Sequence, residues 1–170
     1  AGLPCGLFRV LAGPGQGTVA ALLAAPEIAK VVFVGGVAAG RAVAATAAAR
    51  GVPTVLELGG KSANIVFDDA DFASAIQGAQ QAIYAGSGQS CVAGSRLLVQ
   101  RSLHDRFIAA LAEAQRRIRL GDPLDAATEM GPVANARQFA HVRELLAAGE
   151  ASGAAVMAAA RPSELPEGGF

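Results

Sequence analysis

Cys91 is the residue whose type and surroundings best fit a nucleophile. It lies in residues 87–95, SGQSCVAGS, a segment rich in Gly, Ser and Gln rather than an apolar stripe. Such a loop leaves backbone N–H groups free to hold a thiolate or an oxyanion. A lone cysteine is more often a small buried hydrophobic residue, and that interpretation stays open here. The other cysteine, Cys5, has no comparable surroundings, and we expect no role for it.

Glu57 could act as a general base. It stands near the end of the apolar run 54–58, and ligands of open α/β sheets bind at the ends of strands. A carboxylate is costly to bury without a partner, so burial there would tune it for proton transfer. A salt bridge to Lys61 would explain the same carboxylate without catalysis.

Two glycine-rich segments could approach a phosphate. The first follows the apolar run 31–34 and holds Gly35, Gly36 and Gly40. Small residues between a strand and a helix let the backbone come close to a phosphate, and the helix N-terminus adds partial positive charge. Because the three-glycine dinucleotide fingerprint is missing, a plain structural turn is an equal alternative. The second segment, 13–17 (GPGQG), lacks the Gly-Lys-Ser/Thr of a P-loop, so we favour a structural turn there.

The elements that must position these residues alternate between short apolar runs and longer helical patterns. The predicted strands are residues 7–11, 31–34, 54–58, 64–67, 96–100 and 154–158. The predicted helices are residues 18–25, 38–50, 71–85, 102–120 and 133–148, and Gly51 is expected to end the second of them. The 102–120 helix has an apolar stripe that includes Phe107. Strands and helices joined by short loops predict parallel α/β sheets. The glycine pair at 59–60 is the best place for a domain boundary.

Composition narrows the class of protein. Lys+Arg and Asp+Glu number 14 each, which argues against a nucleic-acid partner. The sequence has no apolar run of the ~18 residues that a membrane span needs, so we expect no membrane association. The first residues lack a signal-peptide pattern and two cysteines make no disulfide framework, so we expect a cytoplasmic protein. Neither His104 nor His141 falls in a metal-ligand spacing, and no metal site is predicted.

Two segments resemble the active-site signatures of the NAD(P)-dependent aldehyde dehydrogenase superfamily. Residues 57–62, ELGGKS, are similar to its glutamate signature, and residues 88–96, GQSCVAGSR, to its cysteine signature. Residues 33–36, FVGG, together with Gly40 resemble its strand and turn over the cofactor pyrophosphate. Residues 120–123, LGDP, and 130–132, MGP, resemble later landmarks. The resemblance runs over essentially all 170 residues.

This resemblance implies an aldehyde dehydrogenase-like α/β fold. Residues 1–59 would be the second half of a Rossmann-type NAD(P)-binding domain, and residues 60–170 the N-terminal part of the catalytic (thiol) domain. The chain would then be the central part of a longer enzyme, and we expect the isolated fragment to be inactive. For the full-length enzyme the resemblance implies a homodimer or homotetramer.

By the same resemblance, Cys91 attacks a small-molecule aldehyde, and Glu57 activates the water that hydrolyses the resulting thioester to a carboxylic acid. The contacts to NAD or NADP would come from Phe33, Gly35, Gly36, Gly40, Leu58 and Gly59. Gly36 stands where the family commonly has a serine, so its contact to the phosphate would use the backbone alone. Two alternatives remain: a CoA-acylating aldehyde dehydrogenase, and a non-catalytic relic of the fold.

Overall fold

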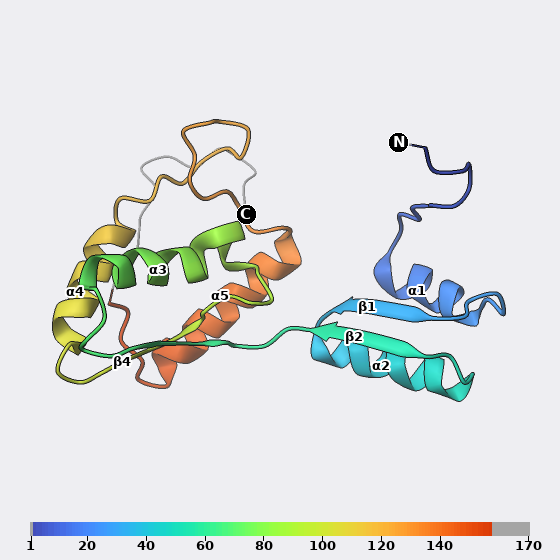
Figure 1. Ribbon diagram of the computed structural model, residues 1–170, viewed down its shortest axis with the longest axis horizontal. Coiled ribbons are helices and arrows are strands. Elements are labelled where there is room, and N and C mark those ends of the chain that lie inside the picture. The colour runs from blue at the N-terminus through green and yellow to red at the C-terminus, as the bar shows by residue number, and fades with distance from the viewer. Residues whose placement is uncertain (1, 158–170) are drawn as a thin grey trace. The chain divides into compact units, whose positions relative to one another are not determined.

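Two short parallel sheets, one in each half of the chain, form the framework of the structure. Figure 1 shows the sheet of the first half as two neighbouring arrows. The computed structural model describes residues 2–157. The chain divides into two compact units, Ala1–Gly59 and Gly60–Phe170. Parallel strands connected through helices are what the alternating pattern predicts, so the α/β fold class is confirmed.

The first unit runs helix, strand, helix, strand. Its elements are α1 (Gly15–Ala24), β1 (Val31–Gly35), α2 (Val37–Ala49) and β2 (Thr54–Leu58). β1 and β2 pair in parallel, from Val31 opposite Thr54 to Gly35 opposite Leu58. Short runs rich in β-branched residues predict both strands, and the structure confirms them. Gly51, with φ at +69°, follows α2 as the predicted C-terminal glycine.

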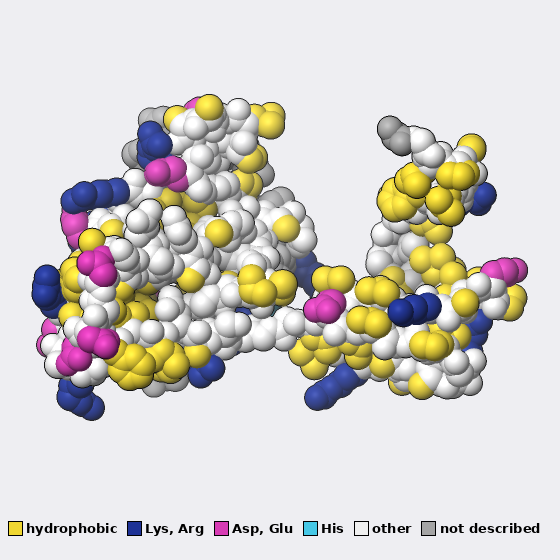
Figure 2. All heavy atoms as spheres, in the orientation of Figure 1, with side chains coloured by type: hydrophobic (Ala, Val, Ile, Leu, Met, Phe, Trp, Pro, Cys, Tyr) yellow, Lys and Arg dark blue, Asp and Glu magenta, His cyan; other side chains and the backbone are white. Residues whose placement is uncertain are grey.

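The two faces of the β1–β2 sheet have different surroundings. Side chains alternate between the faces of a strand, and α2 packs against one of them with Val43 and Ala47 buried. On the other face Val32, Val34 and Val55 are 63%, 71% and 40% exposed. Figure 2 shows hydrophobic side chains gathered over these strands. The sheet of this unit therefore has an uncovered apolar face.

Arg50 ties α1 to the end of α2. Its guanidinium donates hydrogen bonds to the carbonyl oxygens of Leu23 and Ala25, the latter at 2.8 Å. These carbonyls lie at the C-terminus of α1, where the helix dipole carries partial negative charge. The positive guanidinium therefore satisfies the last carbonyl groups of α1 and complements its dipole. The Leu23 side chain is buried at this point.

The second unit contains the other sheet and most of the helices. Its elements are β3 (Ala63–Val66), α3 (Phe72–Tyr84), the 3₁₀ turn η1 (Ala85–Gly88), β4 (Arg96–Val99), α4 (His104–Gln115) and α5 (Ala136–Ala151). β3 pairs with β4 in parallel, with α3 as the crossover. Asn135 caps α5, because its side-chain oxygen accepts the N–H of Gln138 at 2.9 Å. The predicted start at residue 133 is therefore moved to Ala136.

Phe107 is the centre of the core of this unit. It is fully buried and packs with Val66 and Ala79. The Phe72 ring meets it edge-on, with centroids 5.9 Å apart, and the Arg106 guanidinium lies 4.0 Å from the Phe72 centroid. Truncating a buried phenylalanine costs roughly 3–5 kcal/mol, a large share of the stability of a domain. The apolar stripe predicted on the 102–120 helix therefore does face the core at Phe107.

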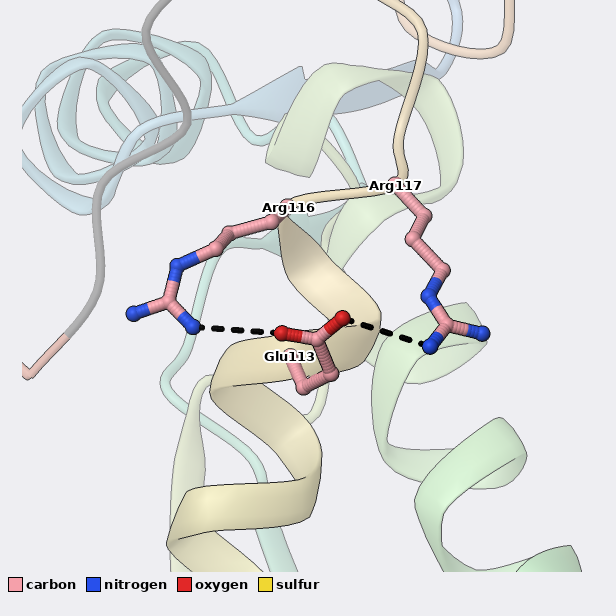
Figure 3. A network of polar contacts seen from close by, with 3 residues as sticks. All are labelled: Glu113, Arg116 and Arg117. Carbon is pink, nitrogen blue, oxygen red and sulfur yellow. Dashed lines mark hydrogen bonds and ion pairs between the residues drawn. The ribbon is translucent and has the colours of Figure 1, made fainter.

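α4 ends at Gln115, earlier than the sequence predicts. Past its end, the Arg116 and Arg117 guanidiniums donate to the two carboxylate oxygens of Glu113 at 3.3 and 3.2 Å (Figure 3). These hydrogen bonds lower the pKa of Glu113 below its usual value, and the bond from Arg117 has the largest effect. The two arginines and Glu113 are all exposed, so this cluster lies at the surface beside the end of α4.

A pairing between residues 119–121 and 129–131, called here the Leu120–Met130 bridge, prevents the helix from extending to residue 120 as the sequence predicts. The Arg119 carbonyl accepts hydrogen bonds from the N–H groups of Glu129 and Met130 at 2.8 and 3.1 Å. The Arg119 N–H donates to the Glu129 carboxylate at 2.9 Å, which lowers the pKa of Glu129. Backbone groups used in this bridge cannot continue the helix.

Two predicted strands are wrong where the structure describes them. Residues 7–11 form no strand, and Leu7, Phe8 and Val10 are 68–76% exposed. Residues 154–157 are also not a strand, and residue 158 lies outside the described residues. A strand needs a hydrogen-bonding neighbour, which neither segment finds between residues 2 and 157. No helix in that same range is long and apolar enough to cross a membrane.

Candidate active site

Cys91 lies at the corner of a tight turn between η1 and β4. The Ala93 N–H donates to the Ser90 carbonyl at 3.2 Å, so Cys91 and Val92 are the two central residues of the turn. Cys91 is exposed, whereas Ala93 is buried. The turn therefore leaves the Cys91 thiol exposed, while the chain becomes buried two residues later, at Ala93.

The C-terminal side of this turn is packed closely against α3 and β3. The Gly94 N–H donates to the Ala82 carbonyl at 2.8 Å. A Cβ at Gly94 would lie 3.1 Å from the Cβ of Ala82 and 3.2 Å from that of Asn64. Only glycine fits this approach without displacing its neighbours.

The backbone N–H of Cys91 is available to a ligand. Among residues 2–157 it makes no hydrogen bond, while the next amide, that of Val92, lies 3.4 Å from the Ser90 hydroxyl oxygen. A free N–H beside an exposed thiol can stabilise an oxyanion formed by attack of that thiol. This geometry fits covalent catalysis and does not fit a cysteine that serves as core packing.

The N-terminal side of the Cys91 turn is held by two side chains that the sequence analysis missed as functional residues. Ser87 donates its hydroxyl to the Gly131 carbonyl at 2.9 Å. The Gln89 side-chain oxygen accepts the Ala134 N–H at 2.9 Å. The signal in the sequence was the place of Gln89, two residues before Cys91 in a polar loop, but its partner could not be read from the sequence.

Glu57 stands beside Val34 in the register of the first sheet, near the C-terminal end of β2. Its side chain alternates with those of Leu56 and Leu58 and therefore lies on the uncovered face. Glu57 is exposed, so the burial expected at this position is not provided by its own unit. The alternative partner, Lys61, belongs to the second unit.

The residues predicted to contact the cofactor do come together in the first unit. A Cβ at Gly35 would lie 2.8 Å from the tip of the Phe33 ring, and one at Gly40 would contact the Leu58 side chain and the same ring. The Gly59 N–H donates to the Gly35 carbonyl at 3.3 Å. Parallel pairing of β1 with β2 places these residues at the same end of the sheet.

The start of α2 completes this arrangement. Gly36 is the N-cap residue, and no side chain caps the helix. A Cβ at Gly36 would meet nothing within 4 Å. Open space in front of uncapped helix N–H groups is what a pyrophosphate requires, so these residues fit the phosphates of a dinucleotide. The other glycine-rich segment differs, since Gly15 and Gly17 belong to the first turn of α1.

Within residues 2–157, no group of three or more His, Cys, Asp or Glu side chains is placed so that it could hold a metal ion. His104 and His141 lie beside Asp105 and Glu144, at 2.8 and 3.8 Å, on exposed surfaces.

Comparison with known proteins gives a consistent family. The model of the aldehyde dehydrogenase family matches residues 1–170. A hydroxyisobutyraldehyde dehydrogenase of Mycolicibacterium austroafricanum is 38% identical over 170 residues, which is all of this chain and 34% of the relative. Betaine aldehyde dehydrogenase 1 of Rhizobium meliloti is 46% identical over 154 residues, 91% of this chain and 31% of the relative. The chain thus spans about a third of the length of these curated relatives.

Solved structures agree with the sequence relatives. PnpE in complex with nicotinamide adenine dinucleotide superposes with a TM-score of 0.86 at 37% identity, covering 89% of this chain and 31% of that one. A betaine aldehyde dehydrogenase from Staphylococcus aureus in complex with NAD+ superposes with a TM-score of 0.73 at 42% identity. The match covers 75% of this chain and 25% of that one.

Proposed function

Because the chain belongs to the aldehyde dehydrogenase family, we propose that the whole protein oxidises an aldehyde to a carboxylic acid with NAD or NADP. The observation that carries this proposal is the exposed Cys91 thiol at the corner of an anchored turn, with its own N–H free. Relatives that bind NAD+ support the choice of cofactor. Residues 1–59 would belong to the cofactor-binding domain and residues 60–170 to the catalytic domain.

The Cys91 thiolate is the nucleophile in this proposal. It forms a C–S bond to the aldehyde carbon, and the carbonyl electron pair moves to the oxygen, where the Cys91 N–H stabilises the charge. The nicotinamide, when bound, supplies the hydride acceptor. The thiohemiacetal on Cys91 loses its hydride from carbon and becomes a thioester.

Glu57 acts on the thioester. Its carboxylate takes a proton from water, the resulting hydroxide adds to the acyl carbon, and the C–S bond breaks to restore the thiolate. The acyl group leaves as the carboxylic acid. The exposure of Glu57 supports access to water, and its place near the C-terminal end of β2 supports a site at the edge where ligands of α/β sheets bind.

The glycine turn binds the cofactor in this proposal. The N–H groups at the start of α2 hold the pyrophosphate, and Gly35, Gly36 and Gly40 allow its close approach. Phe33, Leu58 and Gly59 shape the same end of the sheet and contact the cofactor. Chemically, this requires only backbone donors and an apolar surface, both of which the first unit provides.

The substrate in this proposal is a small-molecule aldehyde. Betaine aldehyde and hydroxyisobutyraldehyde, after which the relatives are named, are the first compounds to test. A cytoplasmic location and a homodimeric or homotetrameric full-length enzyme stay predictions.

The test is an assay of the complete enzyme with an aldehyde, NAD or NADP, and coenzyme A either present or omitted. We expect reduced cofactor and free carboxylic acid without coenzyme A. A requirement for coenzyme A, with an acyl-CoA product, would instead establish the acylating alternative. A folded protein with no aldehyde-dependent reduction and an unreactive Cys91 would support the non-catalytic relic.

A further inference from the structure

We propose that Gln89 is a positioning residue that holds the Cys91 turn against residues 131–134, so that the thiol and the Cys91 N–H keep a fixed geometry. This inference rests on the proposed function, because it assumes that Cys91 is the nucleophile. It assigns a role to the segments around residues 120–123 and 130–132, which the catalytic residues do not use.

Both ends of the Gln89 amide have partners. The side-chain oxygen accepts the N–H of Ala134 at 2.9 Å, across 45 residues of sequence. The side-chain nitrogen donates to the Gly86 carbonyl at 3.4 Å, within the same loop. An amide used at both ends has a fixed orientation, so Gln89 connects the loop before Cys91 to the segment before α5.

Ser87 makes a second connection to the same segment. Its hydroxyl donates to the Gly131 carbonyl at 2.9 Å. Ser87 has φ at +57°, a left-handed conformation that is unfavourable for a residue other than glycine. Such a conformation persists where surrounding contacts hold it, and here the hydroxyl contact does so. The loop is therefore joined to residues 131–134 at two points.

Residues 131–134 are themselves held at both ends. On one side, the Leu120–Met130 bridge includes a hydrogen bond from the Gly121 N–H to the Met130 carbonyl at 3.2 Å. A Cβ at Gly131 would lie 3.4 Å from the Cβ of Pro123, so the two residues are neighbours at van der Waals distance. On the other side, Asn135 caps α5. The segment can therefore serve as a rigid platform for the nucleophile loop.

The Cys91 turn lies between two anchors. Behind it, the Gly94 N–H is bound to the Ala82 carbonyl, and ahead of it Gln89 is bound to the platform. Removing Gln89 would take away the contact nearer to Cys91 and leave only that of Ser87 with Gly131 on this side of the turn, while the Gly94 side stays in place. We therefore expect a defect in the chemical step at Cys91, because a misplacement of about 1 Å can cost on the order of 10²-fold in rate.

The primary test is Gln89→Met in the complete enzyme, with the rate of the first-turnover burst of reduced cofactor measured by rapid mixing. We expect the burst rate to fall roughly 10- to 100-fold, while the KM for the cofactor stays within about twofold. Gln81→Met is the matched control, since Gln81 is an exposed glutamine of α3 whose side chain makes no hydrogen bond among the described residues. Its burst rate should match that of the parent.

Ala134→Pro is a second variant that removes the donor instead of the acceptor. Ala134 lies before the N-cap residue of α5, so a proline there removes the N–H without interrupting a hydrogen bond of the helix. If the contact between Gln89 and Ala134 carries the effect, the double variant should be no more than about twofold slower than the slower single variant. Losses that multiply in the double variant would overturn the proposal.

Two further outcomes would also overturn it. One is a Gln89→Met burst rate within about twofold of the parent. The other is a Gln89→Met variant whose cofactor affinity and burst rate fall by the same factor while its unfolding midpoint is also lowered. That result would make Gln89 merely structural. Failure of the proposed function is distinguishable, because the parent enzyme would then show no aldehyde-dependent burst in the same experiment.

Discussion

The two cysteines of the chain are both exposed, yet only Cys91 lies in a turn that is anchored to other elements of the described structure. Cys5 also lies in a turn, which the Leu7 N–H closes on the Pro4 carbonyl at 3.2 Å, but no hydrogen bond among the described residues ties that turn to a helix or strand. The Cys91 turn is bound on one side to the Ala82 carbonyl of α3 and on the other, through Gln89, to Ala134. A nucleophile needs thiolate character and access together, and exposure alone supplies only the second.

Cys91→Ala should therefore reduce aldehyde oxidation by the complete enzyme to background, and Cys5→Ala should leave it within about twofold. Turnover is measured as aldehyde-dependent formation of reduced cofactor. Covalent labelling of the acyl-enzyme by a slow aldehyde, read by mass, should fall on Cys91 alone. Substantial turnover in Cys91→Ala would contradict the mechanism.

Glu57→Gln separates the roles of the two catalytic groups. The amide keeps the shape of the side chain but cannot accept the proton of water. We expect a burst of reduced cofactor near one equivalent per site, followed by steady turnover slower by on the order of 10²–10⁴-fold. The acyl group should remain on Cys91 and be detected by mass.

The control for this experiment is Lys61→Met, which removes the cation of the alternative salt bridge. If Glu57 served only as the partner of Lys61, both variants would lower the unfolding midpoint and leave the kinetic pattern intact. If Glu57 primed the cysteine instead, the burst itself would slow and no acyl-enzyme would accumulate.

At the scale of elements, the junction of β1 and α2 tests the cofactor site. A side chain at Gly35 would press on the Phe33 ring, whereas one at Gly36 would enter open space. Gly35→Val should therefore displace the turn and weaken cofactor binding by roughly tenfold, which corresponds to about 1.4 kcal/mol. Cofactor affinity measured by fluorescence or calorimetry gives the comparison.

Gly36→Ser is the matched variant at the next position. Its φ of −72° suits any residue, and serine is a favourable N-cap residue. We expect it to keep cofactor affinity at least equal to that of the parent. An unchanged affinity in Gly35→Val would favour the plain structural turn.

The start of α3 carries a pH dependence that can be measured. The Asp71 carboxylate accepts hydrogen bonds from Ser74, which hold the pKa of Asp71 below its ordinary value of 3.8. A carboxylate with a lowered pKa stabilises the folded state at pH values above its unfolded pKa. That contribution is lost as pH falls through the lowered pKa of the folded state.

Asp71→Asn keeps an acceptor for the helix N-terminus but no longer titrates. Between neutral pH and about pH 3, its unfolding midpoint should therefore fall less steeply than that of the parent. The control is Asp69→Asn, a neighbouring carboxylate that does not cap α3. Identical acid dependence in Asp71→Asn and the parent would show that the cap contributes nothing through its charge.

At the scale of the whole molecule, the uncovered face of the first sheet sets the behaviour of this chain on its own. Val32, Val34 and Val55 are exposed there, and each strand of the pair has an open edge in the described structure. Open edges with apolar side chains template association between chains. The isolated 170-residue chain should therefore self-associate at micromolar concentration and bind a hydrophobic dye.

Replacing Val32 and Val34 with lysine should reduce that association, as measured by sedimentation and dye fluorescence, because charges on an open sheet oppose pairing. The control replaces Arg9 and Arg41 with lysine, which leaves the net charge of the chain unchanged. A parent chain that stays monomeric and binds no dye would contradict the expectation.

Local patterns were sufficient for much of this molecule. The β-branched runs 31–34 and 54–58 predicted β1 and β2, and the glycine after α2 marked its end, because these features depend on residues close together in the sequence. The polar surroundings of Cys91 likewise placed it on a loop. The same patterns failed at residues 7–11, where strand propensity is present but no pairing neighbour exists among the described residues.

Tertiary structure decided the rest, because the deciding contacts join residues far apart in the chain. The parallel register of β1 and β2 brought Phe33 and Gly40 to Leu58, which neither segment indicates by itself. The pairing of Arg119 with Glu129 keeps α4 from extending to Leu120, although the helical pattern of the sequence continues that far. The contact of Gln89 with Ala134 spans 45 residues. Its partner is a backbone N–H, which nearly every residue has, so the residue type at position 134 does not indicate the contact. A chain encodes its local conformations through neighbouring side chains, but such long-range contacts form only when packing fixes the two segments together.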